Sequence, residues 1–145
     1  MKKAAFAFAL LLAACETVPT AGTTGAPGGS SIPAAPIELG DWRNAAAAEV
    51  LATFEQTAAS RYAEGSPLSA AVGDLRHNEF NCGPAPPDES GRGDPPQQVC
   101  RRTMSANNCT HTWQVHLFAE GGTLTRTRGL YDRRCGGDGL LGGPG

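Results

Sequence analysis

Residues 109–135 read CTHTWQVHLFAEGGTLTRTRGLYDRRC, and this stretch decides the fold. Polar and apolar residues alternate over residues 110–119, and a period of two is the signature of a half-buried β-strand. Residues 123–134 are expected to form its partner strand. Between the two segments, Gly121-Gly122 suits the backbone of a tight hairpin turn. The stretch therefore predicts a β-hairpin. The side chains expected on the inner side of its first strand are Trp113, Val115, Leu117 and Ala119.

The hairpin also predicts which cysteines meet. With the turn at the glycine pair, opposite residues of the two strands have numbers that sum to about 243 or 244. In the higher register Cys109 lies directly across from Cys135, and Trp113 lies opposite Tyr131, which is a favourable aromatic pair. We therefore predict a disulfide between Cys109 and Cys135.

Working outward from the hairpin, residues 97–103 predict a further strand, joined to it by the turn at residues 105–108. The alanine-rich residues 41–63 predict a helix with Asp41 as its N-cap, because apolar side chains recur there every three or four positions. Residues 66–78 open on a Ser-Pro pair and predict a second helix. The side chains expected on the inner helix faces are Ala47, Leu51, Phe54, Ala58, Tyr62, Leu68, Ala71 or Val72, and Leu75.

The predicted elements follow the order helix, helix, strand, strand, strand. The expected fold class is α+β, with two N-terminal helices packed on one face of a small three-stranded antiparallel sheet. About 100 residues are left for this domain, so its core is small and disulfides would stabilise it appreciably.

The start of the chain has the features of a bacterial export signal. Lys2-Lys3 precede an apolar run at residues 4–14, which is too short to span a bilayer core that takes about 20 residues. Leu12-Ala13-Ala14-Cys15 resembles the bacterial lipobox, in which the cysteine thiol is joined to diacylglycerol and the signal is cut just before it. The resemblance implies a signal peptide at residues 1–14 and a lipid-modified Cys15 as the first residue of the mature protein.

The rest of the chain divides by composition. Residues 15–40 are rich in Pro, Gly, Thr and Ser, which predicts a flexible tether that holds the domain on the order of 30 Å from the membrane. The domain is expected at residues 41–135 and a frayed tail at residues 136–145. Glu16 stands where an aspartate tends to keep lipoproteins of enteric bacteria in the inner membrane. The outer membrane, facing the periplasm, is therefore favoured.

The two remaining cysteines of the domain, Cys82 and Cys100, are expected to form a second disulfide, because an even cysteine number in a short exported domain is typical of a disulfide framework. A zinc site is the alternative. The four cysteines are separated by 18, 9 and 26 residues, without the close Cys-x-x-Cys pair of structural zinc sites. His111 and His116 are predicted on opposite faces of one strand and cannot bind one metal together. No metal or other cofactor is expected.

Charge is distributed unevenly along the chain. Residues 15–94 hold four arginines and eleven acids, whereas residues 95–145 hold six arginines and three acids. A basic segment fits nucleic acid or an anionic surface, but an exported protein rarely meets nucleic acid. No nucleic-acid partner is therefore expected. The sequence also lacks the nucleophile, phosphate-loop and metalloprotease motifs of enzymes, so a non-catalytic protein is favoured.

One surface is singled out as a binding face on the outer side of the hairpin. It combines basic and apolar side chains, and small domains rarely expose such a mix without covering it or using it for binding. Partial cover by the helices or the tail is the alternative. The residues expected on this face are His116, Phe118, Leu124, Arg126, Arg128 and Leu130.

These features predict a lipid-anchored accessory module that binds a protein partner in the cell envelope. Its element order is similar to that of the small lipoprotein of the outer-membrane β-barrel assembly machinery, a similarity that carries over no residue role. The alternative is an inhibitor or protective lipoprotein that blocks an enzyme such as a lysozyme, with residues 83–96 as its working loop. An envelope enzyme is the third class.

Overall fold

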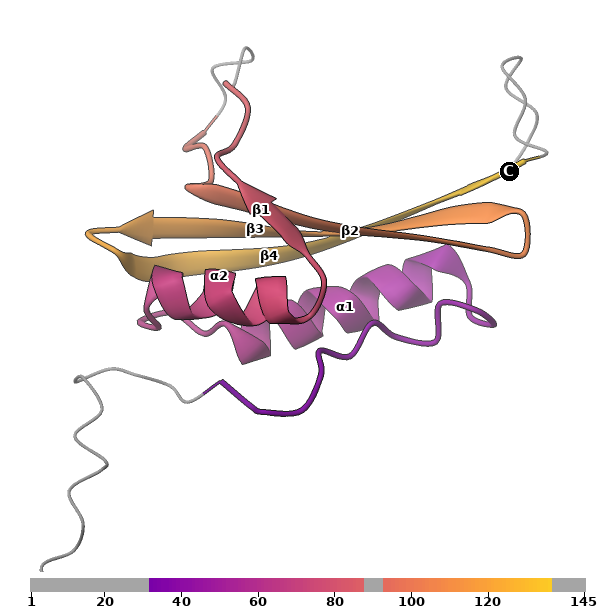
Figure 1. Ribbon diagram of the computed structural model, residues 1–145, viewed down its shortest axis with the longest axis horizontal. Coiled ribbons are helices and arrows are strands. Elements are labelled where there is room, and N and C mark those ends of the chain that lie inside the picture. Colours follow the sequence, from indigo (N-terminus) through magenta and orange to yellow (C-terminus); the bar gives the residue numbers. More distant parts are fainter. Residues whose placement is uncertain (1–31, 88–92, 137–145) are drawn as a thin grey trace, which may run out of the picture.

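The computed structural model describes residues 32–87 and 93–136 of the 145-residue chain. The predicted signal peptide, Cys15, most of the tether and nearly all of the tail lie outside these residues. The described elements are α1 (Ala47–Arg61), α2 (Leu68–His77), β1 (Asn81–Gly83), β2 (Gln98–Ala106), β3 (Cys109–Glu120) and β4 (Thr123–Cys135). The strands form one antiparallel sheet in the order β1-β2-β3-β4. Both helices lie on the same side of this sheet (Figure 1), which confirms the α+β class.

The prediction of three strands is wrong, because β1 pairs with β2 as a fourth strand. β1 has three residues, too few for an alternating pattern to be recognised in the sequence. Cys82 of β1 lies opposite Cys100 of β2 and is bonded to it. The added strand also changes the element order on which the similarity to the assembly-machinery lipoprotein was based.

Both predicted disulfides are confirmed. Cys82 is bonded to Cys100, and Cys109 is bonded to Cys135. Cys109 lies directly across from Cys135 in the β3–β4 ladder, and Trp113 lies across from Tyr131, as the higher of the two predicted registers requires. Next to the glycine turn the pairs follow the lower register instead, with Ala119 opposite Leu124 and Glu120 opposite Thr123. A β-bulge separates the two segments of the ladder.

Helix α1 begins at Ala47, so the prediction of a start at Asp41 is wrong. Residues 41–45 form a turn instead, in which the Asp41 carbonyl accepts hydrogen bonds from the backbone N–H groups of Asn44 and Ala45. This turn directs Trp42 toward the end of the sheet. There its ring packs edge-on against the rings of His111 and Trp113, with distances between ring centroids of 4.7 and 5.6 Å. Burial of aromatic area at the sheet outweighs the helix propensity of the local sequence.

The side chains that were predicted on the inner faces of the helices are buried or partly buried. Phe54, Ala58, Tyr62, Ala71 and Leu75 are buried, whereas Ala47, Leu51, Leu68 and Val72 are partly buried at the edge of the core. The sequence prediction missed Val50, which is buried in the core beneath α1, the helix that packs on β4. The helix backbone passes so close to Gly129 of β4 that a Cβ there would lie 2.9 Å from the Phe54 carbonyl oxygen. Only glycine fits this position.

Residues 32–40 are a packed strap, which corrects the prediction that the tether extends to residue 40. Ile37 is buried, and its backbone N–H donates to the Asn78 side chain at 2.9 Å. The Trp113 indole N–H donates to the Leu39 carbonyl at 3.2 Å. The strap runs along the helices on the side away from the sheet (Figure 1). The packed domain therefore starts before residue 41.

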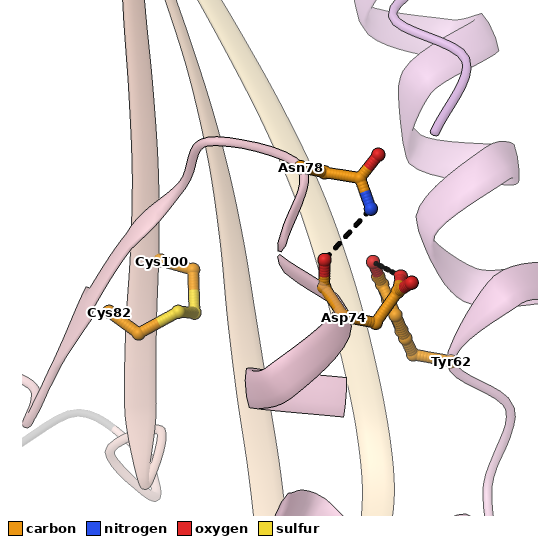
Figure 2. Close-up of a disulfide and its surroundings, with 5 residues drawn as sticks. All are labelled: Tyr62, Asp74, Asn78, Cys82 and Cys100. Carbon is orange, nitrogen blue, oxygen red and sulfur yellow. Dashed lines mark hydrogen bonds between the residues drawn. A yellow bond between two sulfur atoms is a disulfide. The ribbon is translucent and has the colours of Figure 1, made fainter. Parts of the chain in front are cut away.

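An ion pair joins the strap, α1 and α2. The Asp74 carboxylate accepts hydrogen bonds from Arg61 at 2.8 and 3.1 Å and from the Tyr62 hydroxyl at 2.7 Å. Arg61 also donates to the carbonyl oxygens of Pro33 and Ala35 in the strap. Figure 2 shows Tyr62 turned toward Asp74, and Asn78 donating to the Asp74 backbone carbonyl.

These contacts shift the pKa values of the buried groups. Burial alone would raise the pKa of Asp74, but the hydrogen bonds from Arg61 and Tyr62 and the positive charge of Arg61 outweigh it and lower that pKa. Burial, followed by the hydrogen bond to Asp74, raises the pKa of Tyr62. Asp74 is therefore ionised and Tyr62 neutral near pH 7, the pair of states in which the hydroxyl donates to the carboxylate.

Candidate functional site

In the described residues, helices cover one of the two faces of the sheet (Figure 1). The face toward the helices holds the buried side chains of β3, namely His111, Trp113, Val115 and Leu117. In the part of the chain that the structure describes, both helices lie on that side and no helix packs on the other (Figure 1). We call this other side the open face. Its central side chains are Arg101 of β2, Gln114, His116 and Phe118 of β3, and Arg126, Arg128 and Leu130 of β4.

The prediction that Leu124 shares this face is wrong. Phe118 pairs with Arg126, but the next residue, Ala119, pairs with Leu124, so Thr125 is an extra residue on β4. This bulge breaks the alternation of side chains along the strand. Leu124 consequently faces the helices, where it is 1 % exposed and its backbone exchanges hydrogen bonds with Gly65 and Ser66.

The other five predicted residues come together on the open face. Arg128 lies directly opposite His116, and Arg126 lies opposite Phe118. The Arg126 guanidinium lies 4.0 Å from the centre of the Phe118 ring, a cation–π contact. Arg126 and Arg128 are exposed, while His116, Phe118 and Leu130 are half-buried. The face therefore combines exposed cationic groups with partly exposed apolar side chains.

The predicted binding face did not include Arg101, nor Gln114, although alternation places Gln114 on the same side of the strand as His116. Arg101 lies opposite Gln114, which in turn lies opposite Leu130, so one row of side chains crosses three strands. The signal that could have located Arg101 is the pair Asn107-Asn108, both in the left-handed backbone conformation that a two-residue hairpin turn requires. A turn centred there sets the register of β2 against β3.

The arginines of the open face have no acidic partner within the described residues. The ion pairs there join Arg61 to Asp74, Arg102 to Glu79 and Arg134 to Asp132. The open-face acid Asp132 is thus already paired with Arg134 at the far end of β4. Arg101, Arg126 and Arg128 therefore make no ion pair with the described acids, although Asp94 and Glu120 line a hollow with Arg126, and Asp132 lines one with Arg101.

His116 responds to this charge. Its pKa is lowered, first by burial and then by the positive charges of Arg128 and Arg101. The His116 Nε2 atom lies 3.2 Å from Gln114 Oε1. The charges of both arginines therefore act in the same direction as burial, against protonation of the imidazole.

A hollow adjoins one end of the open face. It is lined by Phe118, Glu120 and Arg126 from the hairpin and by Asp94, Pro95 and Gln97 from the segment that leads into β2. Residues 93–96 of this segment belong to the Pro-rich loop at residues 83–96, the alternative working loop. In the structure the two candidate regions are neighbours, and Phe118 and Arg126 are common to both.

The remaining sequence candidates are accounted for by structural contacts. His111 is 3 % exposed on the helix side, with Nδ1 2.7 Å from the Tyr131 hydroxyl, so it faces away from His116 as predicted. The four cysteines of the domain are joined in disulfides, which leaves no thiolate for zinc. Among residues 32–87 and 93–136, no group of three or more His, Cys, Asp or Glu side chains is arranged to hold a metal ion.

Comparison of the chain with protein-family models, with curated proteins and with solved structures finds no match. None of the helices in the described residues combines the length and the apolar character needed to cross a membrane. The chemistry of the open face is therefore the basis on which a function can be assigned to the domain.

Proposed function

We propose that this protein is a lipid-anchored, non-catalytic module of the bacterial cell envelope, which binds an acidic surface of a partner protein through the open face of its sheet. The observation that carries the binding part is the cluster of exposed arginines near Phe118 that form no ion pair with any acid in residues 32–87 and 93–136. The anchor is supported by the sequence Leu12-Ala13-Ala14-Cys15 at the end of a short apolar run. We place it at the outer membrane, facing the periplasm.

The open face has the composition of a binding surface. Arginine and aromatic side chains dominate the energetics of protein interfaces, because both combine apolar area with specific polar contacts. Phe118 and Arg126 present such a pair, and Leu130 adds apolar area beside Arg128. Positive charge without an ion-pair partner selects a partner of opposite charge and speeds association with it.

A second candidate is an inhibitor or protective lipoprotein that blocks an enzyme such as a lysozyme. The observation in its favour is the hollow in which residues 93–97 lie beside Phe118 and Arg126. A partner that entered this hollow would contact both the loop and the open face. Replacement of residues 84–87 and 93–96 by Gly and Ser distinguishes the two functions, since it should abolish enzyme inhibition but leave binding through Arg128 in place.

The anchor predicts the fate of Cys15→Ser. Wild-type protein purified from cells should begin at Cys15 and carry acyl mass, because the thiol is the acceptor of the lipid. Cys15→Ser should lack acyl mass and lose its stable association with membranes. Intact-mass spectrometry and membrane fractionation provide the measurements. Wild-type protein that begins at Met1, without acyl mass and with all cysteines reduced, would contradict the envelope assignment.

The open face predicts the effect of the double charge reversal Arg126→Glu/Arg128→Glu. Crosslinking in intact cells, followed by mass spectrometry, should show specific neighbours of the wild type with acidic surfaces. The double variant should lose these neighbours by about tenfold or more, because each reversal turns an attraction into a repulsion.

The matched control reverses two exposed arginines outside the open face, Arg43→Glu/Arg76→Glu, and should keep the same neighbours. Its net charge change equals that of the open-face variant, so it separates a local effect from a general one. An identical set of neighbours for the wild type and Arg126→Glu/Arg128→Glu would rule out the open face as the binding surface.

A further inference from the structure

Four polar side chains lie together at the centre of the open face. His116 and Gln114 are two positions apart on β3 and so project on the same side of the sheet. Arg128 of β4 is directly across from His116, and Arg101 of β2 is directly across from Gln114. Cross-strand and diagonal neighbours on one face are within reach of long side chains. Both guanidinium groups can therefore converge on the His116–Gln114 pair.

These four groups offer donors almost exclusively. Guanidinium groups have no acceptor, and a protonated imidazole donates from both ring nitrogens. The Oε1 atom of Gln114 is in contact with His116 Nε2, so protonated His116 occupies it and leaves the Gln114 amide N–H groups free. A cluster of donors with net positive charge fits a group that only accepts, namely an ionised oxyanion.

The surroundings favour the carboxylate of a protein segment over a small inorganic anion. Val99 lies opposite His116 on the β2 side, and Leu130 lies opposite Gln114 on the β4 side, so apolar side chains flank the four donors. A peptide with alternating acidic and apolar side chains would cover the donors and the apolar flanks together. Free phosphate would leave Val99 and Leu130 uncovered.

We propose that Arg101, Gln114, His116 and Arg128 form a subsite for the carboxylate of an acidic partner segment, and that its occupancy is coupled to protonation of His116. This inference rests on the proposed function of the open face. A bound carboxylate would supply the ion-pair partner that Arg101 and Arg128 lack among the described residues. The carboxylate then forms an ion pair with the imidazolium of His116 in addition to its ion pairs with the guanidinium groups of Arg101 and Arg128.

The coupling has a definite sign. In the free protein the charged groups that face His116 are Arg128 and Arg101, and with burial they lower its pKa. A carboxylate placed between them favours the protonated imidazole, so the pKa of His116 rises on binding. Binding therefore takes up a proton, and by linkage the affinity increases as the pH falls through this range.

The test uses the full-length protein purified in a nonionic detergent and a synthetic peptide, acetyl-Gly-Leu-Glu-Leu-Glu-Leu-Gly-amide. Titration calorimetry should show an affinity roughly fivefold higher at about pH 6 than at about pH 8, where the peptide carboxylates stay ionised. The matched peptide with Gln in place of both Glu residues should bind at least about tenfold more weakly. The His116 ring resonances should report the rise of its pKa directly.

Variants assign the effect to the subsite. His116→Gln should lose the pH dependence, since glutamine does not titrate. Arg101→Gln and Arg128→Gln should each weaken binding by about tenfold at either pH, because each removes a charge-assisted contact. Arg76→Gln is the control, because this exposed arginine lies in the last turn of α2, on the other side of the sheet (Figure 1). It should bind like the wild type.

Three results would overturn the subsite: equal affinity of the wild type at both pH values, persistence of the pH effect in His116→Gln, or full competition by millimolar inorganic phosphate with no preference for the Glu peptide. The proposed function can fail separately. If cellular neighbours depend on Arg126 and Arg128 but peptide binding is independent of pH, the open face remains the binding surface and the proposed subsite is wrong. If peptide binding depends on pH but no cellular neighbour depends on Arg126 and Arg128, the subsite is supported and the proposed function is not.

Discussion

Asp74→Ala is expected to lower the free energy of unfolding by about 3–5 kcal/mol, because it leaves a buried cation without its counter-ion. The Arg61 side chain is 8 % exposed, and among the described residues Asp74 supplies the carboxylate with which it pairs. The same change leaves the Tyr62 hydroxyl without its acceptor. Because Arg61 also holds the strap through Pro33 and Ala35, the strap should loosen as well. Urea unfolding followed by tryptophan fluorescence measures the loss.

Asp132→Ala is the matched control for this prediction. It also removes an aspartate from an arginine pair, but the Asp132 and Arg134 side chains are 58 % and 84 % exposed. Water replaces such a pair at little cost, so the expected loss is about 0–1 kcal/mol. A similar loss for both variants would show that burial of Arg61 and Asp74 has no energetic consequence.

The lowered pKa of Asp74 predicts the direction of the pH dependence. The carboxylate binds protons more weakly in the folded state than in the unfolded chain, where an aspartate titrates near about 3.9. Its contribution to stability is therefore present above about pH 4 and is lost as the pH falls through the lower folded pKa. Asp74→Ala should flatten this part of the curve of unfolding free energy against pH. A curve unchanged in shape would contradict the assignment.

Cys82→Ala/Cys100→Ala is expected to lower the free energy of unfolding by about 3 kcal/mol, the chain-entropy value for a bond across 18 residues. A local effect adds to this loss. Strand β1 has three residues, and the disulfide holds it against β2 (Figure 2). Without the bond, amide protons of residues 81–83 should exchange with solvent far faster, because so short a strand is unstable alone.

Removal of the second disulfide, Cys109→Ala/Cys135→Ala, is the comparison. Its 26-residue separation predicts a similar entropic loss, since the effect grows only with the logarithm of loop length. Strands β3 and β4 remain paired along their length, so amide protection there should persist under native conditions. Equal protection of residues 81–83 in both variants would show that the Cys82–Cys100 bond does not hold β1.

The hairpin could be predicted well because its determinants are local. Alternation predicts that the side chains of Trp113, Val115 and Leu117 lie on the same, inner face of the sheet. The glycine pair predicts the register that places Cys109 opposite Cys135. Leu124 could not be placed, because the extra residue at Thr125 leaves no mark in the alternating pattern. A bulge is selected by how a strand meets the packed elements beside it.

The candidate site was predicted in part for the same reason. His116, Phe118, Arg126, Arg128 and Leu130 follow from a single hairpin register. Arg101 belongs to another strand, and its place depends on a second register, that of β2 against β3. The absence of ion pairs to these arginines depends on where the acids of the described residues lie in space, which no local pattern contains.

By itself the sequence determined the α+β class, both disulfides and the long hairpin, because each depends on periodicity, turn chemistry or cysteine spacing within short reach along the chain. Tertiary structure alone decided the start of α1, the strap at residues 32–40, the short strand β1 and, among the described residues, the absence of ion pairs to the central arginines of the open face. These features arise from contacts between residues distant in sequence, such as Trp42 with His111 and Arg61 with Pro33. Burial and hydrogen bonding across such distances outweigh local propensity, so they become visible only in the folded chain.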